Sequence, residues 1–260
     1  GDRVSVILPL YQSVADAWRD RLHFERYTYV RLAWRSLYCG LFSYERQGVT
    51  WYFVDNEQYF KRPELYGYYD DGERFAFFCR AVTELLPLLP EKPDVVHCND
   101  WQTALVPIYI RDEAVREEFY KSVRTVITVH NIEYQGKANL SFNYDVIGLP
   151  RECDEILRFD DCTNLMKAAI VTADQVSTVS QTYCQELRYP YYAHGMSQVL
   201  SSRGGDFTGI TNGIDMKLFN PMTTAGLAAH YNEKTFREGK VQNKLALQKE
   251  LGLPEDRDTA

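Results

Sequence analysis

Short apolar runs alternate with amphipathic segments of helical period along most of this chain, and this alternation constrains the fold more than any other feature. Residues 4–8 form a mostly apolar run that ends at Pro9, as expected of a strand covered on both faces. Strands that alternate with helices predict an α/β fold with a doubly wound, mostly parallel sheet. Further strands are predicted at 94–98, 125–129, 175–179 and 207–211, and helices at 72–89, 102–110, 113–120, 165–173 and 182–187.

Two β-rich runs, 38–44 and 49–54, are separated by only four residues. The last of these four is Gly48, which can adopt the backbone conformation that a tight turn requires. The pattern therefore predicts a β-hairpin inserted at the edge of the sheet.

Polar side chains follow four of the predicted strands at the point where each strand ends. In a doubly wound sheet, ligands bind beyond the carboxyl ends of the strands, so chemistry is expected there. Amide, carboxylate and imidazole groups gathered at one rim provide the donors and acceptors that several sugar hydroxyls require. The segments are 97–102, 130–136, 180–182 and 212–215.

Composition excludes some partners. The 29 basic and 36 acidic residues give a net charge of −7, without the basic surplus that nucleic-acid binding requires. No apolar run approaches the roughly 20 residues of a membrane span, and the chain opens without a secretory signal, so a soluble cytoplasmic protein is expected. The six cysteines contain no C-x-x-C pair and are expected to be reduced thiols. The 36 aromatic residues favour carbohydrate binding only slightly over core packing.

Several reaction classes lack their motifs. The chain has no phosphate-binding P-loop, no G-x-S-x-G elbow, no H-E-x-x-H zinc helix and no G-x-G-x-x-G. The acidic pairs Asp70-Asp71 and Asp160-Asp161 fit turn and helix-start roles better than a glycosidase site, because adjacent carboxylates do not reliably flank one bond. No metal ligand set is expected.

The strand-end segments resemble a known family, the amino-terminal catalytic domain of bacterial glycogen synthases and plant starch synthases. The resemblance is carried by Lys-Pro-Asp-Val-Val-His-Cys-Asn-Asp-Trp-Gln-Thr-Ala-Leu at 92–105, Thr-Val-His-Asn-Ile-Glu-Tyr-Gln-Gly at 128–136 and Asn-Gly-Ile-Asp at 212–215. Supporting stretches at 65–71, 74–78, 166–169 and 173–180 follow in the family's order.

The resemblance implies a retaining GT-B glucosyltransferase with two Rossmann-like domains. It implies transfer of glucose from ADP-glucose to the 4-hydroxyl of an α-1,4-glucan, without a metal or other cofactor. His130 would lie beside the anomeric carbon, where its ring and backbone carbonyl stabilise developing positive charge. The residues implied to hold the acceptor glucan are Tyr68, Asp100, Trp101, Asn131 and Gln135. Residues implied to line the cleft are Asn99, Asn164, Lys167 and Asn212.

Structural roles are alternatives for several of these residues. Trp101 could cap the core instead of stacking on a sugar, and Tyr68 could be part of ordinary aromatic packing. Asp100 could cap the helix that follows it, and Asn212 with Gly213 could shape a turn. His97 is expected to be structural.

The chain departs from the family pattern at both ends. It starts at what resembles the family's second strand, without the preceding Lys-x-Gly-Gly-Leu loop. Residues 1–230 are expected to form the amino-terminal domain, and 231–260 a linker and the beginning of the second domain. This polypeptide alone is therefore expected to be inactive. Another sugar donor, such as UDP-glucose, and a non-catalytic glucan-binding role are the alternatives.

Overall fold

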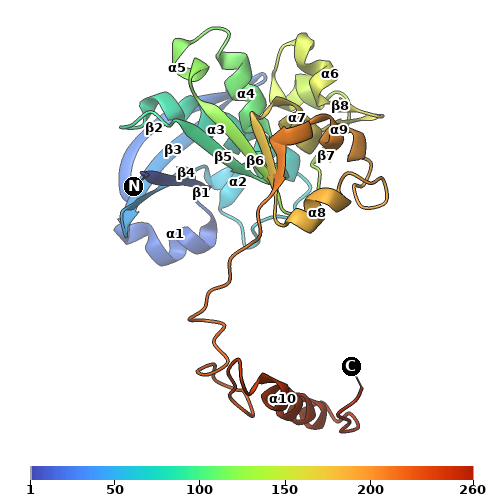
Figure 1. Ribbon diagram of the computed structural model, residues 1–260. Coiled ribbons are helices and arrows are strands. Elements are labelled where there is room, and N and C mark those ends of the chain that lie inside the picture. Colours follow the sequence, from blue (N-terminus) through green and yellow to red (C-terminus); the bar gives the residue numbers. More distant parts are fainter. Residues whose placement is uncertain (1, 260) are drawn as a thin grey trace. The chain divides into compact units, whose positions relative to one another are not determined.

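The computed structural model describes residues 2–259. The chain divides into two compact units between Thr211 and Asn212, and each unit is described by itself. The larger unit contains two four-stranded sheets and a small three-stranded sheet, with helices packed around them (Figure 1). Among residues 2–259, no helix combines the length and apolar character that crossing a membrane requires.

Four parallel strands form the sheet that carries the polar strand ends. Their order is β11-β10-β6-β5. Asn99 lies opposite Thr128 and Thr178 lies opposite Val129, so these strands end along one edge. The predicted α/β fold with a parallel sheet is confirmed. The strands are β5 (Val95–Asn99), β6 (Arg124–Val129), β10 (Gln175–Thr178) and β11 (Phe207–Gly209).

The second sheet has the order β1-β4-β3-β2 and is mixed, because only β1 and β4 run parallel. The predicted hairpin is confirmed, and its turn residues Gln47 and Gly48 have φ of 56° and 77°, as in a two-residue type I′ turn. Its predicted position at the edge of the parallel sheet is wrong: β3 and β4 are the inner strands of this second sheet, because β1 pairs with β4 and the unpredicted β2 pairs with β3. The strands are β1 (Val4–Pro9), β2 (His23–Leu32), β3 (Arg35–Arg46) and β4 (Val49–Asp55).

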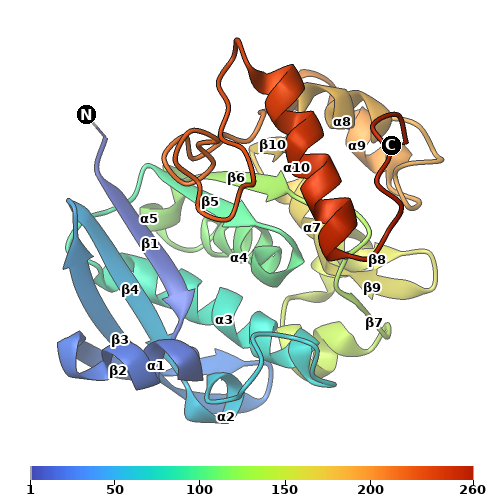
Figure 2. The ribbon, with the colours of Figure 1, turned by 90° about the horizontal axis from the view of Figure 1, so that it is seen from below.

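Helix α3 (Asp71–Leu85) joins the two sheets. It contacts β2 and β4 of the mixed sheet and also packs against α4 (Leu105–Glu113), which in turn contacts α7 (Leu165–Thr172) (Figure 2). Its apolar side chains are buried at the spacing of three and four residues that predicted the helix. The other helices of this unit are α1 (Gln12–Trp18), α2 (Glu57–Phe60), α5 (Glu118–Lys121), α6 (Asp154–Leu157), α8 (Gln181–Glu186) and α9 (Ser197–Ser202).

Residues between β6 and α7 in the chain form a small three-stranded antiparallel sheet, in the order β7-β9-β8. The strands are β7 (Lys137–Ala138), β8 (Arg158–Phe159) and β9 (Cys162–Asn164).

All six cysteines are free thiols, and four of them are buried.

The smaller unit consists of loops and one helix, α10 (Phe236–Glu250). Asn243 ties this helix to the preceding loop, because its Nδ2 donates to the carbonyls of Ala229 (2.7 Å) and Gly239 (2.8 Å). Gly239 is required at its position, since a Cβ there would lie 2.5 Å from the Cβ of Tyr231. The predicted boundary at residue 230, between the amino-terminal domain and the linker to the second domain, stays a prediction.

Candidate active site

Three of the predicted site residues meet where β5 and β6 end. The Nε2 of His130 lies 3.0 Å from the Oδ1 of Asn99, and its backbone N–H donates to the Oδ1 of Asp100 at 2.8 Å. The imidazole of His130 is exposed. Because the amide oxygen of Asn99 only accepts, Nε2 carries the proton of this bond.

Asp100 has an unusual backbone conformation, with φ of 56° and ψ of −174°. A non-glycine residue rarely adopts a positive φ, and such strain persists where the surroundings hold it. Here the backbone N–H donates to the carbonyl of Thr128 at 3.0 Å, and the side chain accepts from His130. The side chain makes no capping bond to the 3-10 turn that follows, so the capping alternative is wrong.

Hydroxyl groups connect the strands beneath this edge. The Nε2 of His97 lies 2.6 Å from the Oγ1 of Thr128, which lies 2.7 Å from the Oγ of Ser177. Partial burial and the neighbouring His130 lower the pKa of His97. The chain of bonds crosses β5, β6 and β10 and fixes the strand that ends at His130. His97 therefore has the structural role expected of it.

Trp101 is half-buried between α3 and the loop after β6. Its ring meets Phe75 edge-to-face, with centroids 5.2 Å apart. Gly136 has φ of 63°, and a Cβ there would lie 2.6 Å from the Cε3 of Trp101. The loop can therefore pass over the indole only because residue 136 is glycine.

Gln135 and Asn164 are buried and bonded to each other. The Nδ2 of Asn164 donates to the Oε1 of Gln135 at 2.8 Å, and the Nε2 of Gln135 donates to the carbonyls of Ile132 and His194, both at 3.0 Å. The Oδ1 of Asn164 caps α7 by accepting from the backbone N–H of Lys167 at 3.0 Å. These amides hold the 130–136 loop against α7.

Lys167 turns toward a different segment. Its Nζ donates to the carbonyls of Glu155 (2.6 Å) and Ile156 (2.9 Å), and partial burial lowers its pKa. Asn131 is exposed, and its Oδ1 accepts from the backbone N–H of Glu133 at 3.0 Å. The side chain of Asn131 is therefore bonded within the loop that carries His130, whereas the side chain of Lys167 bonds to residues 155 and 156, outside that loop.

Tyr68 lies in a separate group before α3. The guanidinium groups of Arg62 and Arg74 lie 4.9 and 5.1 Å from its ring centroid, and its Oη accepts from the backbone N–H of Glu64 at 2.9 Å. The described side-chain contacts of Tyr68 do not include the residues around His130. Asn212 belongs to the smaller unit.

Arg74, within the supporting stretch 74–78, was not among the predicted site residues. It is fully buried, and its Nη1 lies 2.7 Å from the Oδ1 of Asp71. Its Nε and Nη2 have no hydrogen-bond partner among the described residues. The available signal was a charged residue next to Phe75 in a helix whose other periodic positions are apolar.

Within residues 2–259, no group of three or more His, Cys, Asp or Glu side chains could hold a metal ion.

Fold and site together define a Rossmann-like α/β domain, in which the polar groups gather beyond the carboxyl ends of parallel strands. A family model described as the starch synthase catalytic domain matches residues 1–202. The chain belongs to this family. The resemblance inferred from the strand-end motifs is thereby confirmed.

Curated relatives are similar over nearly the whole chain. A glycogen synthase from Lachnospira eligens is 42% identical over 258 residues, which cover 98% of this chain and 54% of that protein. A glycogen synthase from Geobacillus thermodenitrificans is 44% identical over 252 residues, which cover 96% of this chain and 52% of that protein. This chain therefore spans about half the length of these relatives.

A solved structure gives the same assignment. The catalytic domain of starch synthase IV from Arabidopsis thaliana, bound to ADP and acarbose, matches with a TM-score of 0.77 and 33% identity. The match covers 100% of this chain and 54% of that one. The chain therefore has the fold of one Rossmann-like half of a GT-B glycosyltransferase.

Proposed function

We propose that the protein containing this chain transfers glucose from ADP-glucose to the 4-hydroxyl at the non-reducing end of an α-1,4-glucan, with retention of configuration. The observation that carries the proposal is the fixed position of His130 at the end of β6, in a family of starch synthase catalytic domains. The ADP and acarbose bound to the Arabidopsis relative support a nucleotide sugar and a glucan as the two substrates.

His130 acts at the reacting carbon in this proposal. Breaking the glycosidic bond to the nucleotide develops positive charge on the sugar ring, and a carbonyl dipole or neutral imidazole already in place stabilises it. Asn99 orients the ring through Nε2, and Asp100 fixes the backbone of the same residue. Neither partner has to move during the reaction, so the stabilising dipoles are preorganised.

The acceptor glucan lies along the same strand ends in this proposal. Asp100, Trp101 and Asn131 are neighbours of His130 in the two loops and offer a carboxylate, an indole and an amide. Gln135 supports the loop from below, since its amide is bonded within the protein. Tyr68 contributes from the segment before α3. No metal or further cofactor takes part, and the proposed compartment is the cytoplasm.

The chain alone is proposed to be inactive, because it spans about half the length of the relatives. The decisive experiment therefore uses the chain extended to the relatives' full length. ADP release from ADP-glucose is followed with and without glycogen, in the wild type and in His130→Ala. We expect glycogen-dependent release that falls by about 100-fold or more in His130→Ala.

The matched control is His23→Ala, which removes another exposed histidine, on β2. It is expected to keep wild-type activity. UDP-glucose in place of ADP-glucose tests the donor in the same assay. A folded wild type that releases no ADP but is retained by glycogen would overturn the transferase proposal in favour of another donor or of glucan binding alone.

A further inference from the structure

Helix α3 carries a completely buried arginine beside the segment that holds Tyr68. The guanidinium of Arg74 lies 5.1 Å from the ring centroid of Tyr68 and 5.1 Å from that of Phe75. A third ring, that of Phe60, lies 5.6 Å away. Burying a cation is costly, and aromatic faces around it recover part of the cost through their quadrupoles. Because Nε and Nη2 have no hydrogen-bond partner among the described residues, Arg74 acts mainly through these rings and through Asp71.

The acidic pair at the start of α3 connects two arginines to one turn. The Oδ1 of Asp71 accepts from the Nη1 of Arg74 at 2.7 Å, and its Oδ2 accepts from the backbone N–H of Gly67 at 2.5 Å. Asp70 accepts from both terminal nitrogens of Arg62, at 2.5 and 2.6 Å. This bidentate bond lowers the pKa of the Asp70 carboxyl. The adjacent carboxylates thus bind different arginines and fix the turn that begins at Gly67.

Tyr68 lies in this turn and is held at three points. The guanidinium groups of Arg62 and Arg74 lie 4.9 and 5.1 Å from its ring centroid. Its Oη accepts from the backbone N–H of Glu64 at 2.9 Å, which leaves the phenolic hydrogen free to donate to a ligand. The side chain is half-buried. The ring is therefore fixed in orientation while part of its surface stays open to solvent.

The same guanidinium connects Tyr68 to the strand ends at His130. Phe75 follows Arg74 in α3 and meets the indole of Trp101 edge-to-face, with ring centroids 5.2 Å apart. A contact path through these two side chains of α3 therefore joins Tyr68 to Trp101. Both of these aromatic residues belong to the proposed acceptor site, and none of the contacts described for residues 2–259 joins them directly.

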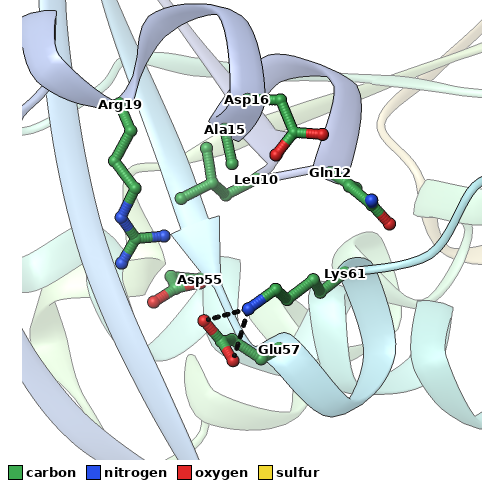
Figure 3. A pocket seen from close by; sticks show the side chains of 8 residues that line it. All are labelled: Leu10, Gln12, Ala15, Asp16, Arg19, Asp55, Glu57 and Lys61. Atoms are coloured by element: carbon green, nitrogen blue, oxygen red, sulfur yellow. Dashed lines mark hydrogen bonds and ion pairs between the residues drawn. The ribbon is translucent and has the colours of Figure 1, made fainter.

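The helix on another side of the guanidinium is fixed by its own bonds. Asn56 caps α2, the helix that carries the buried Phe60. At the end of α2, the Nζ of Lys61 lies 3.2 Å from both carboxylate oxygens of Glu57, beside a pocket of about 290 Å³ (Figure 3). Arg74 is thus enclosed by elements that are themselves held in place, so it can serve as a fixed point for the turn before α3.

We propose that Arg74 is a positioning residue for the acceptor, which sets the place of Tyr68 relative to Trp101 so that both contact one glucan chain. The inference rests on the proposed function, because it takes these two aromatic residues as acceptor contacts. Arg74 is buried and touches no substrate itself. A methionine in its place fills similar space but loses the cation beside the ring of Tyr68 and the bond to Asp71. Acceptor binding then weakens, while donor binding and the chemistry at His130 are kept.

The test uses the protein at the full length of its relatives, with a short maltooligosaccharide as acceptor. ADP release gives kcat and both KM values for the wild type, Arg74→Met and Arg74→Lys. We expect Arg74→Met to raise the KM for the acceptor about tenfold. The KM for ADP-glucose is expected to change by less than about twofold, and kcat by less than about threefold. Arg74→Lys keeps a cation among the rings and is expected to stay within about threefold of the wild-type acceptor KM.

A double-variant cycle with Tyr68→Ala separates positioning from general destabilisation. Since Arg74 acts through Tyr68, we expect Arg74→Met to add less than about twofold to the acceptor KM once Tyr68 is alanine. The matched control is Arg80→Met in the same helix, which removes another largely buried arginine, paired with Glu84 and Glu113. It is expected to leave the acceptor KM unchanged in both backgrounds.

The inference is overturned if folded Arg74→Met keeps the wild-type KM for the acceptor, or if its effect multiplies fully with that of Tyr68→Ala. Should Arg74→Met fail to fold, Asp71→Asn takes its place, because it removes the carboxylate that holds the guanidinium. It is expected to raise the acceptor KM about threefold, and only while Tyr68 is present; an unchanged KM overturns the inference equally.

The proposed function fails separately, if the folded wild type releases no ADP from ADP-glucose. Calorimetric titration with the maltooligosaccharide, without any donor, then still tests Arg74. The dissociation constant is expected to rise about tenfold in Arg74→Met. An unchanged constant in that variant would overturn the positioning role whatever the donor is.

Discussion

The two four-stranded sheets expose their polar and aromatic groups in different ways. In the two inner strands of the parallel sheet, β6 and β10, buried residues such as Ile127, Val129 and Val176 fill the strand interiors, and exposed polar groups follow the strand ends. In the mixed sheet, one face is only partly covered by α1, and Tyr27 and Tyr29 lie open on it. A covered sheet can bind ligands only at its ends, whereas a half-covered sheet exposes a face to solvent.

The two regions also differ in how their side chains are held. At the strand ends, His130 and Gln135 are fixed by hydrogen bonds to other segments. The exposed tyrosines of the mixed sheet, Tyr27, Tyr29 and Tyr38, touch mainly one another and the sheet beneath them. Changes at the strand ends should therefore cost stability as well as activity, and changes of these tyrosines should cost little stability.

Gly136→Ala is expected to have the largest effect on stability at the strand ends, where side chains are held by contacts to other segments. The new Cβ would meet the indole of Trp101 at a position whose positive φ already disfavours alanine. We expect the free energy of unfolding, measured by urea denaturation, to fall by roughly 2–4 kcal/mol. Gly205→Ala is the control, since a Cβ at Gly205 meets nothing within 4 Å; it should change stability by less than about 0.5 kcal/mol. Equal effects of the two would contradict the account of the Trp101 contact.

Asn164→Ala tests the buried amide pair against the exposed tyrosines of the mixed sheet. It leaves the Oε1 of Gln135 without its donor and removes the cap of α7. The expected loss is about 2 kcal/mol in the same denaturation measurement. Tyr29→Ala, on the open face, is expected to cost less than about 1 kcal/mol. If Tyr29→Ala proves the more destabilising, the distinction between a fixed and an open region is wrong.

The sequence predicted the parallel sheet and brought His130, Asn99 and Asp100 to one place, because the ends of adjacent parallel strands share an edge. It also located the hairpin turn at Gly48. It did not predict β2, whose alternation places Tyr27 and Tyr29 on an exposed face. A strand with aromatic residues on its open side lacks the apolar-in, polar-out pattern by which strands are recognised.

The sequence pattern did not predict which residues far apart in the chain contact each other. The bond between Gln135 and Asn164 joins residues 29 positions apart, and nothing local to either residue specifies the other. The positive φ of Asp100 depends on the backbone bond to Thr128 and the bond to His130, which form only once the strands have paired. Such contacts follow from tertiary packing, and motif and period describe only the segments that pack.

The pH dependence of stability gives the smallest expected effect, at His97 below the strand ends. Its lowered pKa means that the unfolded chain binds more protons than the folded one once the pH falls below the ordinary histidine value of 6.5. Stability therefore falls with pH in that range, by less than about 1 kcal/mol because the ring is partly in water. His97→Gln should lose less unfolding free energy than the wild type between pH 7.5 and 5.5. Parallel curves for the two proteins would exclude His97 as the source of this pH dependence.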